Sequence, residues 1–480
     1  MALALAVVAH AAPQRTLLLE VADVPKAEQV KGGRFFYGDY DSSRIIQVVR
    51  NRALLLATPE ELAELRQAGY APKVLFESTD RLQLYRRAEY GPEMKLSPVY
   101  WRYDQILKKA AALARAYPNL ITRFQIGETQ QEHRPIYAFR ISNQAAQPQD
   151  RPKVLFDGVH HADELMGAQI VTALMEQLVT GYGRDKAVTA WLDTLEIYLV
   201  PVVNVDGHHV VTSGHDPRWR KNTHDVNGDG VTGVYPEGVD PNRNYNFNWA
   251  MGGTDNKEGS SYRGPYPFSE SEIRAMRDLA EQVHPTLAVS YHSQGEVIYY
   301  PWSWGGKASP DDAVIARVAK EVASHLVKMD GSGPYAVSPG GPSSQSYAWY
   351  YGHLGIVSMI IETGLGAHVL PPEEVAGIVQ TNLQGARALL AQAAGPGLSL
   401  RVKDAATGAP LQAEVWLPRI DDETIDRRTS DATFGRVHRL LNPGEYYVVV
   451  SRPGYATQVL PAVKIGPAGW TAVEVALTKN

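Results

Sequence analysis

The sequence predicts an α/β fold, in which a sheet is flanked by helices, with an N-terminal α+β module and a C-terminal β-sandwich. From about residue 100, apolar strand-like segments alternate with amphipathic helical segments, which is typical of a sheet covered on both faces. Short strands around one helix precede this region. After residue 395, short alternating runs are separated by turn sequences such as Asn442-Pro443-Gly444, which indicates a small all-β domain.

The composition favours a globular protein with a large core. The chain has 480 residues, of which 44% are hydrophobic and 21% charged, and this length suits two or three domains. The formal net charge of -5 is too small to favour nucleic acid as a partner. Cysteine is absent, so disulfides and thiolate metal sites are excluded, and a metal site must use His, Asp or Glu.

The first 95 residues predict a signal peptide followed by a small α+β module. Residues 1–14 favour a secretory signal peptide, because small apolar residues end in Ala-His-Ala-Ala, and the protein is then secreted or periplasmic. An ordinary apolar N-terminal segment is the alternative. Residues 15–95 predict strands at 15–21 and 45–49 and a short helix from Pro59, and they form either a pro-segment or a packing module. No stretch after the first is apolar and long enough to span a membrane.

The alternating pattern places polar residues at strand ends. The expected strands cover residues 154–156, 195–203, 287–291 and 356–361, and the expected helices cover residues 103–117, 164–179, 269–283, 311–329 and 372–394. Ligands of such sheets bind at the carboxyl ends of strands. His161, His292 and Glu362 each lie at or just beyond such an end.

His161 and Glu164, three residues apart, can face one ion, and a catalytic zinc site takes three protein ligands and keeps one position for water. His292 is the candidate third ligand, and Glu362 is a candidate general base. Taken singly, each residue is also compatible with a purely structural role, as a hydrogen-bonded core histidine or as a capping or edge carboxylate. His160 competes with His161, whose spacing to Glu164 is the better one.

A long polar region, residues 204–266, supplies further candidates. It contains Arg220 in a Trp-Arg-Lys run and Arg243 in an Asp-Pro-Asn-Arg-Asn run at residues 240–244. Arginine binds carboxylates through two parallel hydrogen bonds and stabilises oxyanions, although surface charge is its more usual role. Asp225, Asn227 and Asp229 resemble half of a calcium loop, but Pro236 occupies the position of the bidentate glutamate, so a simple turn is the alternative.

Together these motifs resemble the zinc carboxypeptidases of the carboxypeptidase A type. The elements that carry the resemblance are His161-x-x-Glu164, Arg220 in Trp-Arg-Lys, the run at residues 240–244, His292-Ser293 and Glu362, all in the family's order. The resemblance covers roughly residues 100–394 and implies a mixed sheet flanked by helices, with a catalytic domain over residues 96–395. Residues 396–480 resemble the transthyretin-like β-sandwich that some of these enzymes carry.

The resemblance also implies residue roles. His161, Glu164 and His292 would bind one zinc ion, Glu362 would activate water and Arg220 would polarise the scissile carbonyl. Asn242 and Arg243 would hold the terminal carboxylate of a peptide or protein substrate. A mobile tyrosine is expected as well, for which Tyr335 is the candidate and Tyr347 the rival.

Two positions depart from the family. Asp163 stands where the family often has Arg, and Gln294 stands where it often has Tyr. The run His-Ser-Gln-Gly-Glu is similar to cell-wall peptidases of the same superfamily, so a murein peptide is the alternative substrate. A non-catalytic peptide-binding protein is the third hypothesis. The sequence indicates neither the preferred C-terminal residue nor the oligomeric state.

Overall fold

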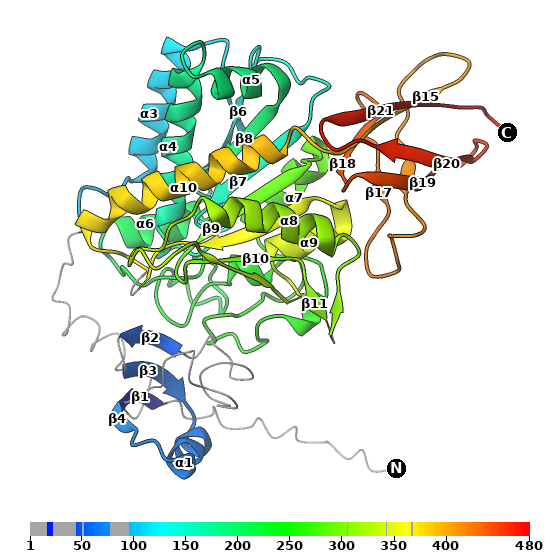
Figure 1. Ribbon diagram of the computed structural model, residues 1–480. Coiled ribbons are helices and arrows are strands. Elements are labelled where there is room, and N and C mark those ends of the chain that lie inside the picture. Colours follow the sequence, from blue (N-terminus) through cyan, green and yellow to red (C-terminus); the bar gives the residue numbers. More distant parts are fainter. Residues whose placement is uncertain are drawn as a thin grey trace, which may run out of the picture. The chain divides into compact units, whose positions relative to one another are not determined.

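The computed structural model describes residues 17–22, 45–49, 52–76, 96–304, 306–341, 343–365 and 368–480 (Figure 1). The chain divides into two compact units, Met1–Met94 and Lys95–Asn480. The predicted signal peptide, residues 1–14, lies outside the described residues. The boundaries predicted for the individual domains stay predictions.

The described part of the first unit is a small antiparallel sheet with one helix. The strands are β1 (Leu17–Ala22), β2 (Ile45–Val49), β3 (Arg52–Ala57) and β4 (Lys73–Phe76), in the order β2-β3-β1-β4. Helix α1 (Pro59–Gln67) begins at Thr58, whose hydroxyl accepts a hydrogen bond from the Glu61 N–H, while the Glu61 carboxylate accepts one from the Thr58 N–H. Leu62 and Leu65 bury the inner face of α1, so the described part of this unit has the predicted α+β fold.

The second unit is built on a mixed eight-stranded sheet. Its strands are β5 (Ile121–Glu128), β6 (Pro135–Ile141), β7 (Lys153–Gly158), β8 (Glu196–Val200), β9 (Leu287–His292), β10 (Val297–Tyr300), β13 (Ala336–Pro339) and β14 (Val357–Glu362). Their order is β13-β10-β14-β9-β7-β8-β6-β5. The four central strands, β14, β9, β7 and β8, run parallel, so their carboxyl ends meet at one edge. Two short strands, β11 (Ser303–Trp304) and β12 (Lys307–Ala308), form a separate sheet.

Helices cover both faces of the sheet (Figure 1). On one face lie α3 (Tyr103–Ala116), α4 (Met166–Gly181), α5 (Lys186–Thr194), α8 (Asp312–Ser324) and α10 (Pro372–Gln392). Helix α7 (Ser271–Val283) packs on the opposite face, α9 (Ser346–Leu354) contacts β9 and β14, and α6 (Val205–Thr212) follows β8. Every residue of β8 and β9 is buried, because helices cover both sides of these strands. The predicted α/β fold is confirmed.

Helix α8 is shorter than the sequence predicts, because it ends at Ser324 rather than near residue 329. The chain reverses there, with a bridge between Val327 and Pro334 and a hydrogen bond from the Tyr335 N–H to the Leu326 carbonyl. The apolar residues after Ser324 belong to this reversal and not to the helix.

The C-terminal strands form two sheets, which confirms the predicted β-sandwich. One has the order β18-β15-β21 and the other β17-β16-β19-β20. The strands are β15 (Gly397–Asp404), β16 (Glu414–Trp416), β17 (Arg428–Thr429), β18 (Arg436–Leu440), β19 (Gly444–Ser451), β20 (Gln458–Ile465) and β21 (Trp470–Leu477). They enclose an apolar core of their own, including Leu398, Val415 and Val450. The likeness to transthyretin stays a prediction.

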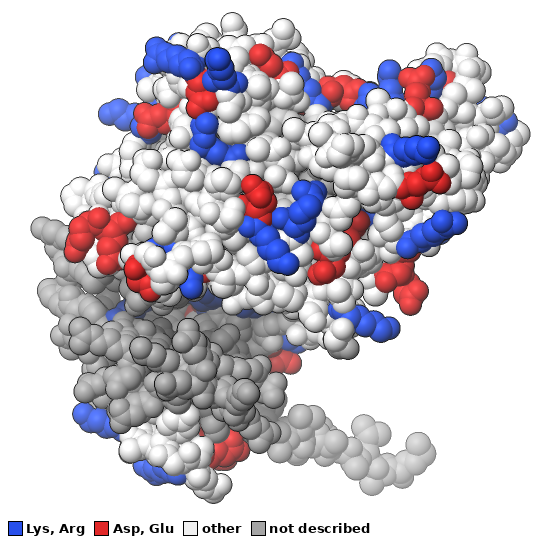
Figure 2. All heavy atoms as spheres, in the orientation of Figure 1, with Lys and Arg blue, Asp and Glu red and all other residues white. Residues whose placement is uncertain are grey.

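Charged side chains are mixed on the molecular surface. On the face drawn in Figure 2, the described Lys and Arg residues alternate with Asp and Glu and form no large area of one sign. This distribution agrees with the small net charge of the sequence. None of the helices in the described part of the chain combines the length and apolarity that a membrane crossing requires.

Candidate active site

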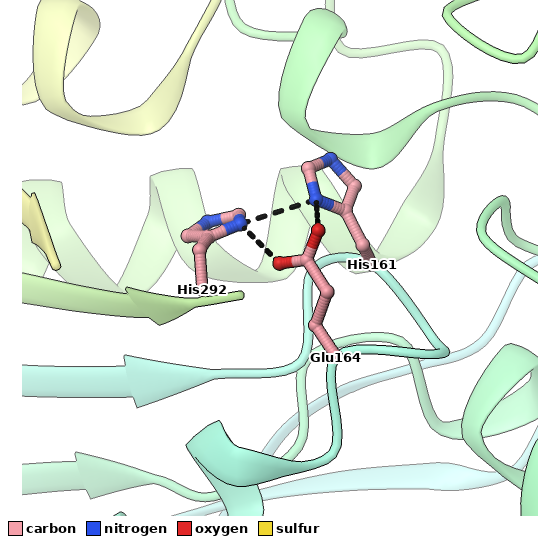
Figure 3. Close-up of side chains that lie close together, drawn as sticks. All are labelled: His161, Glu164 and His292. Atoms are coloured by element: carbon pink, nitrogen blue, oxygen red, sulfur yellow. Dashed lines mark hydrogen bonds and ion pairs between the residues drawn. The ribbon is translucent and has the colours of Figure 1, made fainter. Parts of the chain in front are cut away.

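Three predicted metal ligands converge beyond the carboxyl ends of β7 and β9. The His161 Nδ1 atom lies 2.8 Å from Glu164 Oε1, and His292 Nδ1 lies 2.8 Å from Glu164 Oε2 (Figure 3). The two Nδ1 atoms are 3.1 Å apart, and all three residues are buried. Two imidazole nitrogens and a carboxylate that meet in this way match the donor set of a catalytic zinc site.

Close packing of two glycines brings the ligands to this point. Strand β7 ends at Gly158, and α4 begins soon after Glu164. A Cβ atom on Gly167 of α4 would lie 2.9 Å from Gly158 Cα, so only glycine allows the helix to pack this close to the strand end. Val159 has a φ of 58°, which is strained for a β-branched residue and turns the chain sharply toward the histidines.

Both candidate histidine ligands are also held through the second ring nitrogen. His161 Nε2 lies 3.1 Å from Asp240 Oδ1, and His292 Nε2 lies 3.4 Å from Asn242 Nδ2. Contacts of this kind fix the ring orientation and leave Nδ1 to face the ion. Burial lowers the pKa of His292 to about 4, so this imidazole is neutral at pH 7, as metal ligation requires. The sequence pattern assigned no role to Asp240, although it opens the run at residues 240–244.

Glu362 lies beside the ligands as predicted. It is the last residue of β14 and pairs in register with His292 on the parallel strand β9. Burial and the nearby Glu164 carboxylate raise the pKa of Glu362 to about 8. A carboxylate whose pKa lies near neutrality is suited to accept and return a proton.

Arg220 and Asn242 extend the site on either side of the ligands. The Arg220 guanidinium donates to Asp240 Oδ2 at 3.0 Å and to Glu164 Oε1 at 3.3 Å, and it remains partly exposed. Asn242 is buried, and its Oδ1 accepts the N–H of Ser346 at the start of α9. Arg243 is half-buried and donates to the Asn242 carbonyl at 2.9 Å. Arg220 therefore lies beside Glu164, and Asn242 lies beside His292.

The two tyrosine candidates are both buried in this structure. Burial raises the pKa of Tyr335 to about 12, although hydrogen bonds with the Gly364 backbone and the Asn382 side chain oppose this shift. The Tyr347 hydroxyl donates to the Gly341 carbonyl at 2.8 Å, and burial raises its pKa although the nearby Arg243 charge opposes this. The choice of Tyr335 stays a prediction.

His160, the competing first ligand, has other partners. Its Nε2 lies 2.8 Å from the Tyr245 hydroxyl, and its Nδ1 lies 3.1 Å from Ser290 Oγ. Its ring stacks on that of His292 at 5.6 Å between centroids. His160 therefore packs against His292, and it is His161 that contacts both Glu164 and His292.

The calcium prediction gains no support. Asp225 accepts hydrogen bonds from the N–H groups of Gly228 and Gly230, as a turn-forming aspartate does. Among the described residues, two groups of His, Asp and Glu lie close enough to share an ion, and neither includes Asp225 or Asp229. Asn227 instead donates to the carboxylate of Glu237, so these residues form a hydrogen-bonded turn.

The second of these two groups was not predicted. It consists of Asp163, Glu164 and His368, and the His368 Nδ1 atom lies 2.7 Å from Asp163 Oδ2. Burial disfavours the charged imidazole, but the Asp163 carboxylate outweighs this effect and raises the pKa of His368 to about 9. The departure at Asp163 marked the position, but no sequence pattern linked it to a residue 205 positions later.

Comparison with known proteins agrees with this geometry. The family model for zinc carboxypeptidases matches residues 106–385. Carboxypeptidase A4 of Mus musculus is 29% identical over 311 residues, which cover 63% of this chain and 70% of the relative. Carboxypeptidase B of Homo sapiens is 28% identical over 288 residues, which cover 58% of this chain and 66% of the relative. The chain thus spans about two thirds of the length of these relatives.

Solved structures show the same fold. Carboxypeptidase A from Helicoverpa armigera superposes with a TM-score of 0.60 at 20% identity, covering 78% of this chain and 98% of that one. Thrombin-activatable fibrinolysis inhibitor gives a TM-score of 0.59 at 20% identity, covering 79% and 99%. The comparisons favour neither the murein-peptide alternative nor the non-catalytic one. The chain belongs to the zinc carboxypeptidase family and is a zinc metallocarboxypeptidase.

Proposed function

We propose that this enzyme removes C-terminal residues from peptides with a free terminal carboxylate, using His161, Glu164 and His292 to hold one zinc ion. The convergence of the two Nδ1 atoms on the two Glu164 oxygens carries this proposal. When bound, zinc supplies Lewis-acid polarisation and makes water more acidic. All remaining steps fall to side chains of the chain itself.

Glu362 is proposed as the general base. At the end of β14 beside His292, its carboxylate takes a proton from the attacking water and returns it to the nitrogen of the leaving amine. Its raised pKa supports both transfers near neutral pH. Arg220 is proposed to donate to the scissile carbonyl oxygen as negative charge develops there, because its guanidinium already lies beside Glu164.

Asn242 and Arg243 are proposed to select the free C-terminus. Asn242 is fixed by Ser346 and lies next to His292, and Arg243 projects from the same short 3₁₀ helix, Pro241–Arg243. An arginine fork binds a carboxylate through two parallel hydrogen bonds, which an amide cannot reproduce. The terminal carboxylate of the substrate would thus be bound next to the proposed metal ligands.

Two further predictions complete this proposal. Residues 15–95 are proposed as a pro-segment, and residues 1–14 as a signal peptide that directs secretion or periplasmic export. Mass spectrometry of the mature chain would test both, since cleavage near residue 14 and near residue 95 should then be found. A mature N-terminus that still carries the intact apolar segment would contradict export by this route.

The test compares peptides that differ only at the terminus. Release of the last residue should require zinc, should stop when a chelator is added and should be far slower for the amidated peptide. Arg243→Ala should raise KM for the free-carboxylate peptide by about 100-fold, which corresponds to the loss of a charge-assisted pair. Equal hydrolysis of both peptides by the wild type, or equal effects of the substitution on both, would contradict this role.

A further inference from the structure

A hydrogen-bonded pair of side chains joins two loops at the edge of the site. Asp163 belongs to the loop between β7 and α4 and lies inside the His161-x-x-Glu164 motif. His368 belongs to the loop between β14 and α10, six residues after Glu362. The 2.7 Å contact between Asp163 Oδ2 and His368 Nδ1 therefore links the metal-binding loop to the loop that follows the proposed general base.

Hydrogen bonds hold the loop after Glu362 on both sides of His368. The Thr363 N–H and hydroxyl both donate to the His292 carbonyl, and the Gly364 carbonyl accepts the N–H of Gly295. Beyond His368, the Leu370 carbonyl accepts the Tyr100 hydroxyl at 2.8 Å. Between these ends, Leu365 is 45% exposed, so the loop gains little from apolar packing there.

The same residues could in principle bind a second metal ion, since Asp163, Glu164 and His368 have ligand atoms within 4.8 Å of one another. Arg220 argues against this use, because its guanidinium donates to the shared Glu164 carboxylate. A second dication beside this guanidinium and the zinc would face strong repulsion in a buried site. The 2.7 Å hydrogen bond between Asp163 and His368 already gives each side chain a partner, which favours a structural contact.

We propose that Asp163 and His368 are positioning residues, which hold the loop after Glu362 against the metal-binding loop and so set the Glu362 carboxylate relative to the zinc ligands. This inference rests on the proposed role of Glu362. A catalytic group displaced by about 1 Å can lose about 100-fold in rate, so a contact that fixes its strand end acts on kcat. Asp163 suits this role, because its carboxylate accepts a hydrogen bond from His368, which an arginine at this position could not do.

Two substitutions of His368 distinguish the loss of its hydrogen bond to Asp163 from the loss of side-chain volume. His368→Ala removes the donor, whereas His368→Asn places an amide nitrogen near the position of Nδ1 and keeps a hydrogen bond to Asp163. We expect the alanine variant to lose between about 10- and 100-fold in kcat with KM nearly unchanged. The asparagine variant should recover most of this loss, and both should retain one zinc ion per chain.

Hydrogen exchange supplies a readout independent of turnover. Backbone amides of the loop from Thr363 to Leu370 should exchange faster in His368→Ala than in the wild type or in His368→Asn, with zinc loaded and after its removal. Adding Asp163→Ala to His368→Ala should cause no further loss of kcat, because both changes remove one contact.

Three results would overturn the inference. Unchanged kcat and unchanged exchange in His368→Ala would show that the contact positions nothing. Additive losses in the double variant would show that the residues act separately. Two zinc ions per wild-type chain and one in His368→Ala would assign the pair to a second metal site. A wild type that binds zinc without releasing C-terminal residues would refute the proposed function instead, and the exchange data would still decide whether the contact holds the loop.

Discussion

Individual side chains in the site are held by more than one partner. Glu164 accepts contacts from both histidines and also the N–H of Ser293, while Asp240 holds both His161 and Arg220. Such shared contacts fix the candidate ligands in place, which reduces the cost of ordering them when an ion binds. Glu362 differs, because burial and the like charge of Glu164 both disfavour its ionised form.

Replacement of Glu362 should separate chemistry from metal binding. Glu362→Gln keeps the shape of the side chain but cannot accept a proton, so kcat should fall by at least about 100-fold, the lower range for loss of a general base. The fall in kcat would be measured by quantifying the C-terminal residue that is released at fixed times. A variant with more than a tenth of wild-type kcat would show that another group serves as the base.

The site residues were predictable where they follow apolar strands, because the carboxyl ends of parallel strands meet at one edge of the sheet. His161, His292 and Glu362 were found because each follows an apolar run, and the family order then supplied Arg220 and Asn242. The Asp163–His368 contact was not predictable, because it depends on how two loops fold over the sheet edge. The burial of Tyr335 was likewise invisible in the sequence, since a tyrosine between a reversal and β13 has no pattern of its own.

At the scale of elements, the site depends on how closely α4 approaches the end of β7. The central strands and the main helices were predicted because they are long and continuously apolar or amphipathic. The antiparallel strands β5 and β10 were missed, since they are short or alternate between buried and exposed residues. The contact between Gly158 and Gly167 allows Glu164 to enter the site at the start of the helix.

The same substitution at two helical glycines tests this contact. Gly167→Ala should destabilise the fold by about 1–3 kcal/mol, because the new methyl group meets the backbone of Gly158 and Tyr291. Gly377→Ala in α10 is the control, since nothing lies within 4 Å of a Cβ atom there, and it should stabilise the fold by about 0.5–1 kcal/mol. Urea unfolding would measure both, and equal changes would contradict the close-packing account.

At the scale of the whole second unit, a buried ion network joins the sheet-and-helix body to the β-sandwich. Asp311, just before α8, accepts from Arg428 at 2.6 Å and from Arg439 at 2.8 Å, and Arg439 also donates to Asp421. All four side chains are almost fully buried. Arg428 in turn donates to the Gly355 carbonyl at the end of α9, whose first residue contacts Asn242. The sandwich thus braces the helix that supports the proposed carboxylate site.

Removal of the Asp311 charge should strongly destabilise this arrangement. Asp311→Asn leaves two buried arginines short of a counter-charge and should cost about 3–5 kcal/mol. The control is Asp150→Asn, which breaks a more exposed contact of the sandwich, with Arg436, and should cost less than about 1 kcal/mol. Thermal unfolding would measure both changes, and similar small losses would contradict the role of the network.

The network also predicts a pH dependence. Burial raises the pKa of Asp311, but Arg439 and Arg428 outweigh it and lower the pKa below its ordinary value of about 4. The stabilisation is therefore complete above about pH 4 and is lost as the pH falls through the lowered pKa of the folded state. The Tm of the wild type should fall more steeply below pH 4 than that of Asp311→Asn, and parallel curves would refute the linkage.

Zinc content per chain, measured by elemental analysis after dialysis against a weak chelator, tests the central assignment most directly. The wild type and Glu362→Gln should each retain about one zinc ion, while His161→Ala and His292→Ala should retain almost none, because a three-ligand site does not survive the loss of one ligand. Full zinc in either histidine variant, or loss of zinc in Glu362→Gln, would contradict the assignment of His161, Glu164 and His292 as the ligands.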